Sequence, residues 1–121
     1  MNFIEFVKNF KKDIDYTKTG MMLFHNGVVR GTSRQGDKVT KIQVKKDAKK
    51  IKEIIKEIEN LKGITKADAY VFEGEFSIGD DLMYAAVAGD IRDNVFPALQ
   101  KLVNTIKKEA VFKKEILQNY S

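Results

Sequence analysis

The side chains best suited to chemistry in this sequence are basic residues placed where predicted helices and strands end. Arg30 directly follows an apolar strand, and Arg92 comes just before a long helix. Lys107 lies near the far end of the same helix, and Lys113 and Lys114 follow it. An arginine beside a helix N-terminus, with its free backbone N–H groups, is suited to binding an anion. Lysines at a helix C-terminus also interact favourably with the helix dipole, so a purely structural role stays open for them.

Other chemical signatures are missing. The sequence has no P-loop, no dinucleotide-binding fingerprint, and neither an HExxH nor a GxSxG motif. It has no cysteine, which excludes disulfides, thiolate metal ligands and a cysteine nucleophile, and we predict neither a metal site nor a cofactor. The carboxylates of Asp80 and Asp81 lie in a turn and do not define a catalytic pair. His25, the only histidine, lies on an apolar strand, where a packed or hydrogen-bonded residue is more common than a ligand or base.

The composition fits one domain over residues 1–121. A hydrophobic content of 43% can supply one core in a chain of 121 residues. The formal net charge of +5 favours anionic partners, although a solubilising lysine-rich surface explains it equally well. The segment Met1–Phe10 lacks the pattern of a signal peptide, and no apolar run approaches the roughly 20 residues that span a bilayer. We therefore expect a soluble, cytoplasmic protein without membrane contact.

Apolar periodicity predicts the elements that must position the basic residues. A short helix is predicted over Asn2–Asp13, followed by a strand over Met21–Val29 with a bulge or close backbone approach at Gly27. Alternation predicts a half-buried strand over Lys38–Val44. The residues on its buried face would be Thr40, Ile42 and Val44.

The second half predicts two longer helices and two strands. Asp47 is the predicted N-cap of a helix that Gly63 closes. Strands follow over Thr65–Phe72 and Asp81–Ala88, separated by turn residues. A helix is predicted over Asn94–Lys108, and because Pro97 is tolerated only near a helix start, the predicted cap is Asp93 or Asn94. Phe112–Glu115 is interpreted as a basic tail. The element order predicts an α+β fold with helices packed on one sheet.

Four segments, in order along the chain, resemble motifs of the large, catalytic subunit of molybdopterin synthase. Residues 20–30 read GMMLFHNGVVR and are similar to its GxxxxFxGxVR strand. Residues 74–80 read GEFSIGD and are similar to its GxLxxGD hairpin. The next strand ends near Arg92, where the family has Ser-x-His-Arg. Residues 106–115 resemble the family's Leu-Lys-x-Arg-x-Pro-x-Trp-Lys-[Lys/Arg]-Glu. The resemblance thus extends over most of the chain.

The resemblance implies a hammerhead-like α+β fold with an antiparallel or mixed sheet. It implies a homodimer, or a heterotetramer in which the dimer holds a small ubiquitin-like sulfur carrier at each end. The carrier's C-terminal Gly-Gly thiocarboxylate would enter a basic pocket, and two sulfurs would pass to a cyclic pyranopterin monophosphate to form the molybdopterin dithiolene. We therefore expect a sulfurtransferase of molybdenum or tungsten cofactor biosynthesis.

The resemblance also implies roles for the basic residues. Arg30 would be the strand-end arginine of the pocket, Arg92 would help bind the substrate phosphate, and Lys107 would be the first catalytic lysine. Lys114 matches the second catalytic lysine by ungapped count, whereas a one-residue gap gives that role to Lys113, which would otherwise bind substrate. Preorganised cations suit an anionic reaction, and a lysine desolvated among other cations can act as an acid, a base or a nucleophile.

Several positions depart from the family motifs. Ile91 stands where the family has the histidine of Ser-x-His-Arg, and His25 stands where the strand has phenylalanine. One alternative is therefore a protein of the same fold that binds a carrier or a phosphorylated ligand without synthase activity. A small basic RNA-binding domain is less favoured, because the aromatic residues occupy core-like positions. The sequence further predicts that Arg30, Arg92, Lys107 and Lys114 converge on one anion site, if necessary across a dimer interface.

Overall fold

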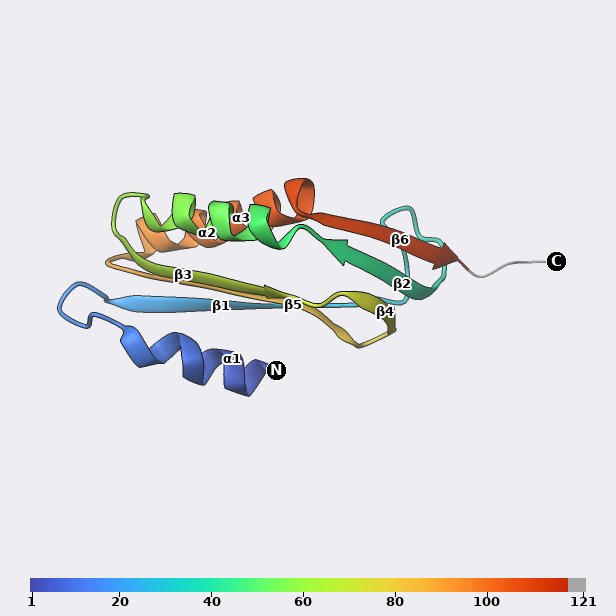
Figure 1. Cartoon of the computed structure of the whole chain (residues 1–121), viewed down its shortest axis with the longest axis horizontal. Helices are drawn as coiled ribbons and strands as arrows, with labels where there is room; N and C mark the ends of the chain where they lie inside the picture. The colour runs from blue at the N-terminus through green and yellow to red at the C-terminus, as the bar shows by residue number, and fades with distance from the viewer. Residues whose placement is uncertain (118–121) are drawn as a thin grey trace.

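The computed structural model describes residues 1–117, which contain three α-helices and six strands (Figure 1). The strands form two antiparallel sheets. The helices are α1 (Phe3–Phe10), α2 (Ala48–Glu59) and α3 (Arg92–Glu109), and a short 3-10 helix, η1 (Lys11–Asp13), follows α1. The strands are β1 (Met21–Val28), β2 (Val39–Lys46), β3 (Ile64–Val71), β4 (Gly74–Ser77), β5 (Asp81–Gly89) and β6 (Val111–Leu117). The α+β prediction is confirmed, with two antiparallel sheets in place of the single sheet expected.

The first sheet has the order β1-β5-β3 and lies between two layers of helices. Helices α2 and α3 cover one face and α1 lies against the other (Figure 1). The central strand β5 is buried from Met83 to Gly89 because both faces are covered. Its side chains alternate between two cores, Met83, Ala85 and Val87 facing α2 and α3, and Tyr84, Ala86 and Ala88 facing α1.

The second sheet has the order β4-β2-β6 and extends past one end of the first (Figure 1). Its apolar side chains Val39, Ile42 and Val44 join the same core as α2 and α3. Two of its strands were not predicted. The expected basic tail is strand β6, whose backbone pairs with β2 from Val111 to Leu117, and the segment expected to be only a turn contains β4.

Local sequence signals explain where several elements begin, bend and end. The Asp47 carboxylate accepts a hydrogen bond from the Lys50 amide at 3.0 Å, which confirms the predicted N-cap of α2. Gly63, after the helix, has a φ of +78°, a conformation that favours glycine. The pairing of β1 with β5 shifts between Gly27 and Val28, which confirms the predicted bulge.

Two predicted details are wrong. Thr40 is exposed and Val39 is buried instead, because the register of β2 against β6 shifts between Val39 and Lys41. Helix α3 begins at Arg92 with Ile91 as its N-cap, so neither Asp93 nor Asn94 is the cap. Pro97 is therefore in the second turn of the helix, and it is exposed. Proline has no N–H group, so the Asp93 carbonyl lacks its helical partner and bonds to solvent instead.

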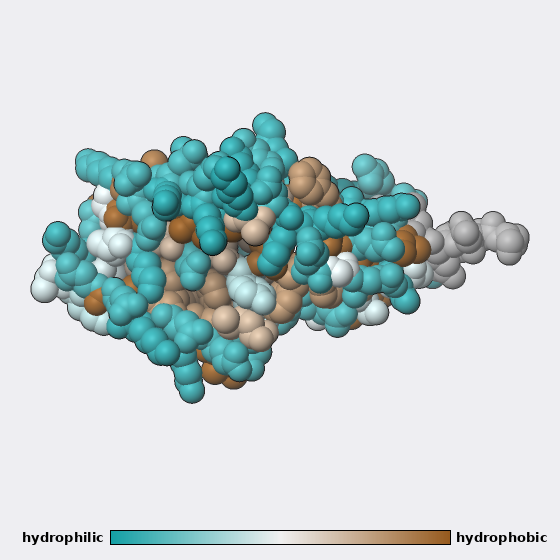
Figure 2. Space-filling model, viewed as in Figure 1, coloured by the Kyte–Doolittle hydropathy of each residue, from teal (hydrophilic) through white to brown (hydrophobic). Residues whose placement is uncertain are grey.

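Hydrophilic side chains cover most of the face shown in Figure 2. Apolar atoms gather in the band between the upper helices and α1, where the edge of the first sheet is seen in Figure 1. None of the helices among residues 1–117 is long and apolar enough to cross a membrane.

Candidate functional site: a basic cavity at the end of helix α3

A cavity of about 510 Å³ lies where the two sheets and the C-terminal end of α3 meet. We call it the basic cavity, because four of its lining side chains are cationic and one is anionic. Its lining residues are Val28, Arg30, Thr32, Arg34, Val39, Ile42, Leu82, Lys107, Lys113 and Glu115. A narrower space of about 70 Å³ adjoins it and shares Lys107 and Lys113 with it. Both spaces therefore have the same two lysines in their walls.

The chain path brings these cations together from distant parts of the sequence. Helix α3 follows β5 directly and packs back along it, so Lys107 reaches the level of Leu82 near the start of β5. Because β1 is antiparallel to β5, its last residues and Arg30 lie at that same end. Strand β6 then leaves α3 along β2 and brings Lys113 to the cavity.

The register of β6 distinguishes the two candidate lysines. Lys113 pairs with Val44 and Glu115 with Ile42, and both of these β2 residues are buried in the core. Alternate residues of a strand face opposite sides, so Lys114, which pairs with the exposed Gln43, lies on the other face of the sheet. Lys114 accordingly lines neither space, and the placement favours the one-residue gap that assigns the second lysine to Lys113.

The electrostatics of the site are dominated by uncompensated positive charge. Desolvation lowers the pKa of Lys107 below its ordinary value, and the positive charges of Lys113 and Arg34 lower it further. Lys107 as a whole residue is exposed, so this desolvation acts on a side chain that is still open to a ligand. Among residues 1–117, the ion pairs are those of Met1 with Glu5 and of Lys41 with Glu75, so no carboxylate pairs with the cavity cations.

Arg34 is a member of the site that sequence reasoning missed. It lies in a polar loop between β1 and β2 that carries no motif, and only the fold brings that loop over Lys107. Its loop is held by a turn in which the Asp37 amide donates to the Ser33 hydroxyl oxygen at 3.1 Å. The available sequence signal was the polar run from Ser33 to Asp37, because a short polar side chain that bonds a nearby backbone amide stabilises a turn; in the structure Ser33 is buried.

Arg92 lies at the opposite end of α3 from Lys107. The two residues are 15 positions apart in one helix, a separation of about 22 Å at the helical rise per residue. Within one chain, therefore, Arg30, Lys107 and Lys113 share the basic cavity and Arg92 does not. The predicted convergence of Arg30, Arg92, Lys107 and Lys114 is therefore not found within one chain, since Lys114 faces away from the cavity and Arg92 could reach it only from a second subunit.

His25 lies on β1 and faces helix α3. It lines a groove between β1 and α3 whose volume is about 430 Å³. This α3 groove is lined by His25, Phe96, Pro97, Leu99, Gln100, Val103 and Asn104. The imidazole is partly buried, and its Nε2 atom is fully buried without a hydrogen-bond partner. His25 is therefore packed, as expected for a lone histidine on an apolar strand, but it is not hydrogen-bonded at Nε2.

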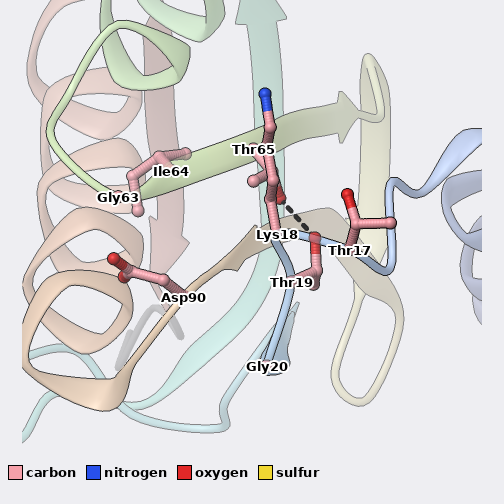
Figure 3. Close-up of a pocket in the computed structure, with 8 residues that line it drawn as sticks. All are labelled: Thr17, Lys18, Thr19, Gly20, Gly63, Ile64, Thr65 and Asp90. Carbon is pink, nitrogen blue, oxygen red and sulfur yellow. Dashed lines mark hydrogen bonds between the residues drawn. The ribbon is translucent and has the colours of Figure 1, made fainter.

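A second polar cavity lies at the other end of the first sheet (Figure 3). We call it the threonine-lined cavity; its volume is about 630 Å³, and Thr17, Lys18, Thr19, Gly20, Gly63, Ile64, Thr65 and Asp90 line it. The dashed line in Figure 3 marks the 2.8 Å hydrogen bond between the Thr19 and Thr65 hydroxyls. The Asp90 carboxylate accepts from the Ile91 amide at 2.6 Å and from the Asn94 side chain at 2.9 Å. The two hydroxyls thus connect the segment before β1 with β3, and the carboxylate is held by the start of α3.

No group of three or more His, Asp or Glu side chains within residues 1–117 is arranged to hold a metal ion. The chemistry available in the basic cavity is that of four cations, the Thr32 hydroxyl and the single carboxylate of Glu115. Such a site is suited to anionic ligands and to reactions in which negative charge develops.

The fold and the cavity define an α+β protein with a cationic site built from both sheets and one helix. A family model described as MoaE protein matches residues 4–109, and the chain belongs to that family. The resemblance found in the sequence motifs is thus confirmed. Membership of the family indicates a role in molybdenum cofactor biosynthesis and suggests an enzyme similar to molybdopterin synthase.

Solved structures share the fold at low sequence identity. Molybdopterin synthase from Staphylococcus aureus aligns with a TM-score of 0.79 and 21% identity, covering 99% of this chain and 88% of that chain. Molybdopterin cofactor biosynthesis protein E from Burkholderia multivorans gives 0.74 and 17%, covering 97% and 84%. A complex of subunits 1 and 2 of molybdopterin-converting factor from Helicobacter pylori gives 0.73 and 14%, covering 99% and 82%. A comparison with curated proteins gave no significant match.

Proposed function

We propose that this chain transfers sulfur from the C-terminal thiocarboxylate of a small carrier protein to a cyclic pyranopterin monophosphate. The product is the dithiolene of molybdopterin, made by two successive transfers. The observation that carries the proposal is the convergence of four cations on one cavity in which none is paired with a carboxylate. The thiocarboxylate, the phosphate and the transition state of acyl-type transfer are all anionic, so the cavity is complementary to each of them.

In this proposal the two lysines have different tasks. Lys107, whose pKa is lowered by desolvation and by neighbouring cations, supplies a proton, takes one up, or attacks the carrier terminus as a free amine. Lys113 faces the same space from β6 and stabilises the negative charge that develops on the thiocarboxylate. Arg30 and Arg34, on the opposite wall, bind the phosphate through guanidinium groups that match its geometry.

The proposed partner is a small ubiquitin-like carrier that ends in Gly-Gly. A C-terminus without side chains suits the narrow space of about 70 Å³ next to Lys107 and Lys113. The Helicobacter pylori relative is a complex of two subunits of a converting factor, which supports an analogous partner for this chain. The thiocarboxylate would thus lie against both lysines while the pterin occupies the wider part of the basic cavity.

We further propose that two copies form a dimer through the free edge of β1. Strand β1 is an edge strand, and Ile91 and Phe96 at the start of α3 are 54% and 56% exposed. A twofold axis beside β1 would place two α3 helices antiparallel to each other. The Arg92 of one subunit would then lie at the Lys107 end of the other, where it could help bind the phosphate.

The experiment that tests the function is an anaerobic incubation of the chain with thiocarboxylated carrier and the pterin precursor. We expect dithiolene formation that depends on the thiocarboxylate, with the carboxylate form of the carrier as the matched control. If both ligands bind but no dithiolene forms, the chain is a binding protein of this fold and the enzymatic proposal is wrong.

A further inference from the structure

His25 is the one histidine of the chain, and it lines the α3 groove close enough to Lys107 of the basic cavity to feel its charge. It lines the groove together with Val103, and Lys107 follows Val103 by one helical turn on the same side of α3. On the strand, Gly27 follows His25 by two positions and so shares its face. Gly27 and Lys107 both line the narrow space beside the basic cavity. The strand face that carries the imidazole and the helix side that carries the lysine therefore meet beside this narrow space, which His25 itself does not line.

The neighbours of His25 leave room for this approach. The residue opposite it on β5 is Ala85, which is fully buried and small. A Cβ atom placed on Gly27 would come within 3.2 Å of both His25 Nε2 and Met83 Cγ. The absence of a side chain at Gly27 thus leaves room between the buried Nε2 atom and the narrow space that Gly27 and Lys107 line.

A buried polar atom without a partner is costly, and Nε2 is the one such side-chain atom within residues 1–117. Neither a donor nor an acceptor lies within hydrogen-bonding distance of it in the structure, so a proton on Nε2 would be unsatisfied. The neutral tautomer with its proton on Nδ1 leaves a lone pair on Nε2, which needs a donor. Lysine carries up to three N–H donors and no acceptor, so Lys107 is the matching group in this part of the site.

We infer that His25 is a positioning residue for Lys107: the lysine side chain turns from its place in the structure and donates a hydrogen bond to the unprotonated Nε2 of the imidazole. This inference depends on the proposed role of Lys107. The hydrogen bond holds a flexible lysine at the mouth of the narrow space and orients it toward the carrier terminus. The hydrogen bond would also explain why this chain has a histidine at the position where the family motif has phenylalanine.

The charges around the pair favour a neutral imidazole. Burial lowers the pKa of His25, and the positive charge of Lys107 lowers it further. The other charged groups that face Lys107 are Lys113 and Glu115 on β6 and the two arginines, Arg30 and Arg34. Because the folded-state pKa of His25 is below its ordinary value of 6.5, folded protein loses stability as pH falls below 6.5. The same protonation removes the acceptor for Lys107.

The test is an NMR titration of His25 and Lys107 in the free protein, which does not depend on sulfur transfer. We expect the Nδ1-protonated tautomer, and a His25 pKa that rises in Lys107→Met because a positive neighbour is lost. In His25→Phe the pKa of Lys107 should fall, because the acceptor that stabilises the ammonium is gone, and His25→Gln should restore it. An Nε2-protonated tautomer would overturn the inference. So would a His25 pKa that is unchanged in Lys107→Met together with a Lys107 pKa that is unchanged in His25→Phe.

Activity provides a second arm if the wild-type chain makes dithiolene. His25→Phe should then reduce the maximal rate by about tenfold, the scale of one hydrogen bond to a charged group, with little change in the Michaelis constant. His25→Gln should recover most of this loss and remove the acidic limb of the pH profile. If His25→Phe is as active as wild type, the inference is wrong even where the proposed function is right. A wild-type chain without activity would refute the proposed function and leave the NMR titration to decide the hydrogen bond.

Discussion

The threonine-lined cavity and the basic cavity differ in how their polar groups are bonded, and this difference is a better guide to function than size. The threonine-lined cavity is the larger, at about 630 Å³ against about 510 Å³. Its hydroxyls bond to each other, and its carboxylate bonds to the start of α3. In the basic cavity the four cations have no carboxylate partner within residues 1–117. Polar groups that already bond to one another stabilise the fold, whereas unpaired cations are available to a ligand.

The largest expected effect comes from removing Lys107. Lys107→Ala should lower dithiolene formation by roughly 10²-fold or more, the scale of losing one proton-transfer or charge-stabilising group. Unfolding free energy should change by no more than about 0.5 kcal/mol, as for other surface substitutions. Lys107→Arg should not restore the rate, because arginine stays protonated and cannot act as a base or an amine nucleophile. Lys52→Ala, on the exposed face of α2, is the control; turnover retained in Lys107→Ala would remove the assigned role.

The next effect distinguishes the two faces of β6. Lys113→Ala should reduce the rate by roughly tenfold or more, the scale of one charge-assisted hydrogen bond. Lys114→Ala changes the same residue type one position away but on the other face of the sheet, so its rate should stay near wild type. Steady-state assays of the two variants side by side provide the measurement. The reverse order of effects would restore the ungapped assignment of the second lysine.

A mixing experiment tests whether Arg92 completes the site across the dimer. Arg92→Ala and Lys107→Ala are each expected to be inactive, because every site in either homodimer lacks one required cation. Subunit exchange between them should recover about a quarter of wild-type activity, since half of the dimers are mixed and each of these has one intact site. Sedimentation checks that the chain is dimeric. A mixture that stays inactive although mixed dimers form would exclude a shared site.

The smallest effect is expected in the threonine-lined cavity. Thr65→Val replaces the hydroxyl with a methyl group of similar size and removes the hydrogen bond to Thr19. Urea denaturation should show a loss of about 1 kcal/mol, the typical net contribution of one such bond. Dithiolene formation should be unchanged. A loss of activity without a loss of stability would mean that this cavity, too, serves the reaction.

The parts of the fold that could be predicted from sequence are those with local causes. Asp47 caps α2 by bonding to an amide three residues away, and the bulge at Gly27 follows from a glycine within an apolar strand. Strand β6 could not be predicted, because the charged residues Lys113, Lys114 and Glu115 stand together at its centre and its pairing with β2 joins positions far apart in the chain. The same long-range register decides between Lys113 and Lys114, which motif counting left open. Arg34 reaches the site only because a loop folds over the end of α3.

The most direct test of the central claim is an NMR titration of the labelled chain with inorganic phosphate. The basic cavity should bind the anion, so the resonances of Arg30, Arg34, Lys107 and Lys113 should shift together with one dissociation constant. The resonances of Thr19, Thr65 and Asp90 should not move, because Lys18 is the one cation lining their cavity and the Asp90 carboxylate lines it as well. Lys107→Ala should weaken the binding. Shifts confined to the threonine-lined cavity, or none at either cavity, would contradict the account.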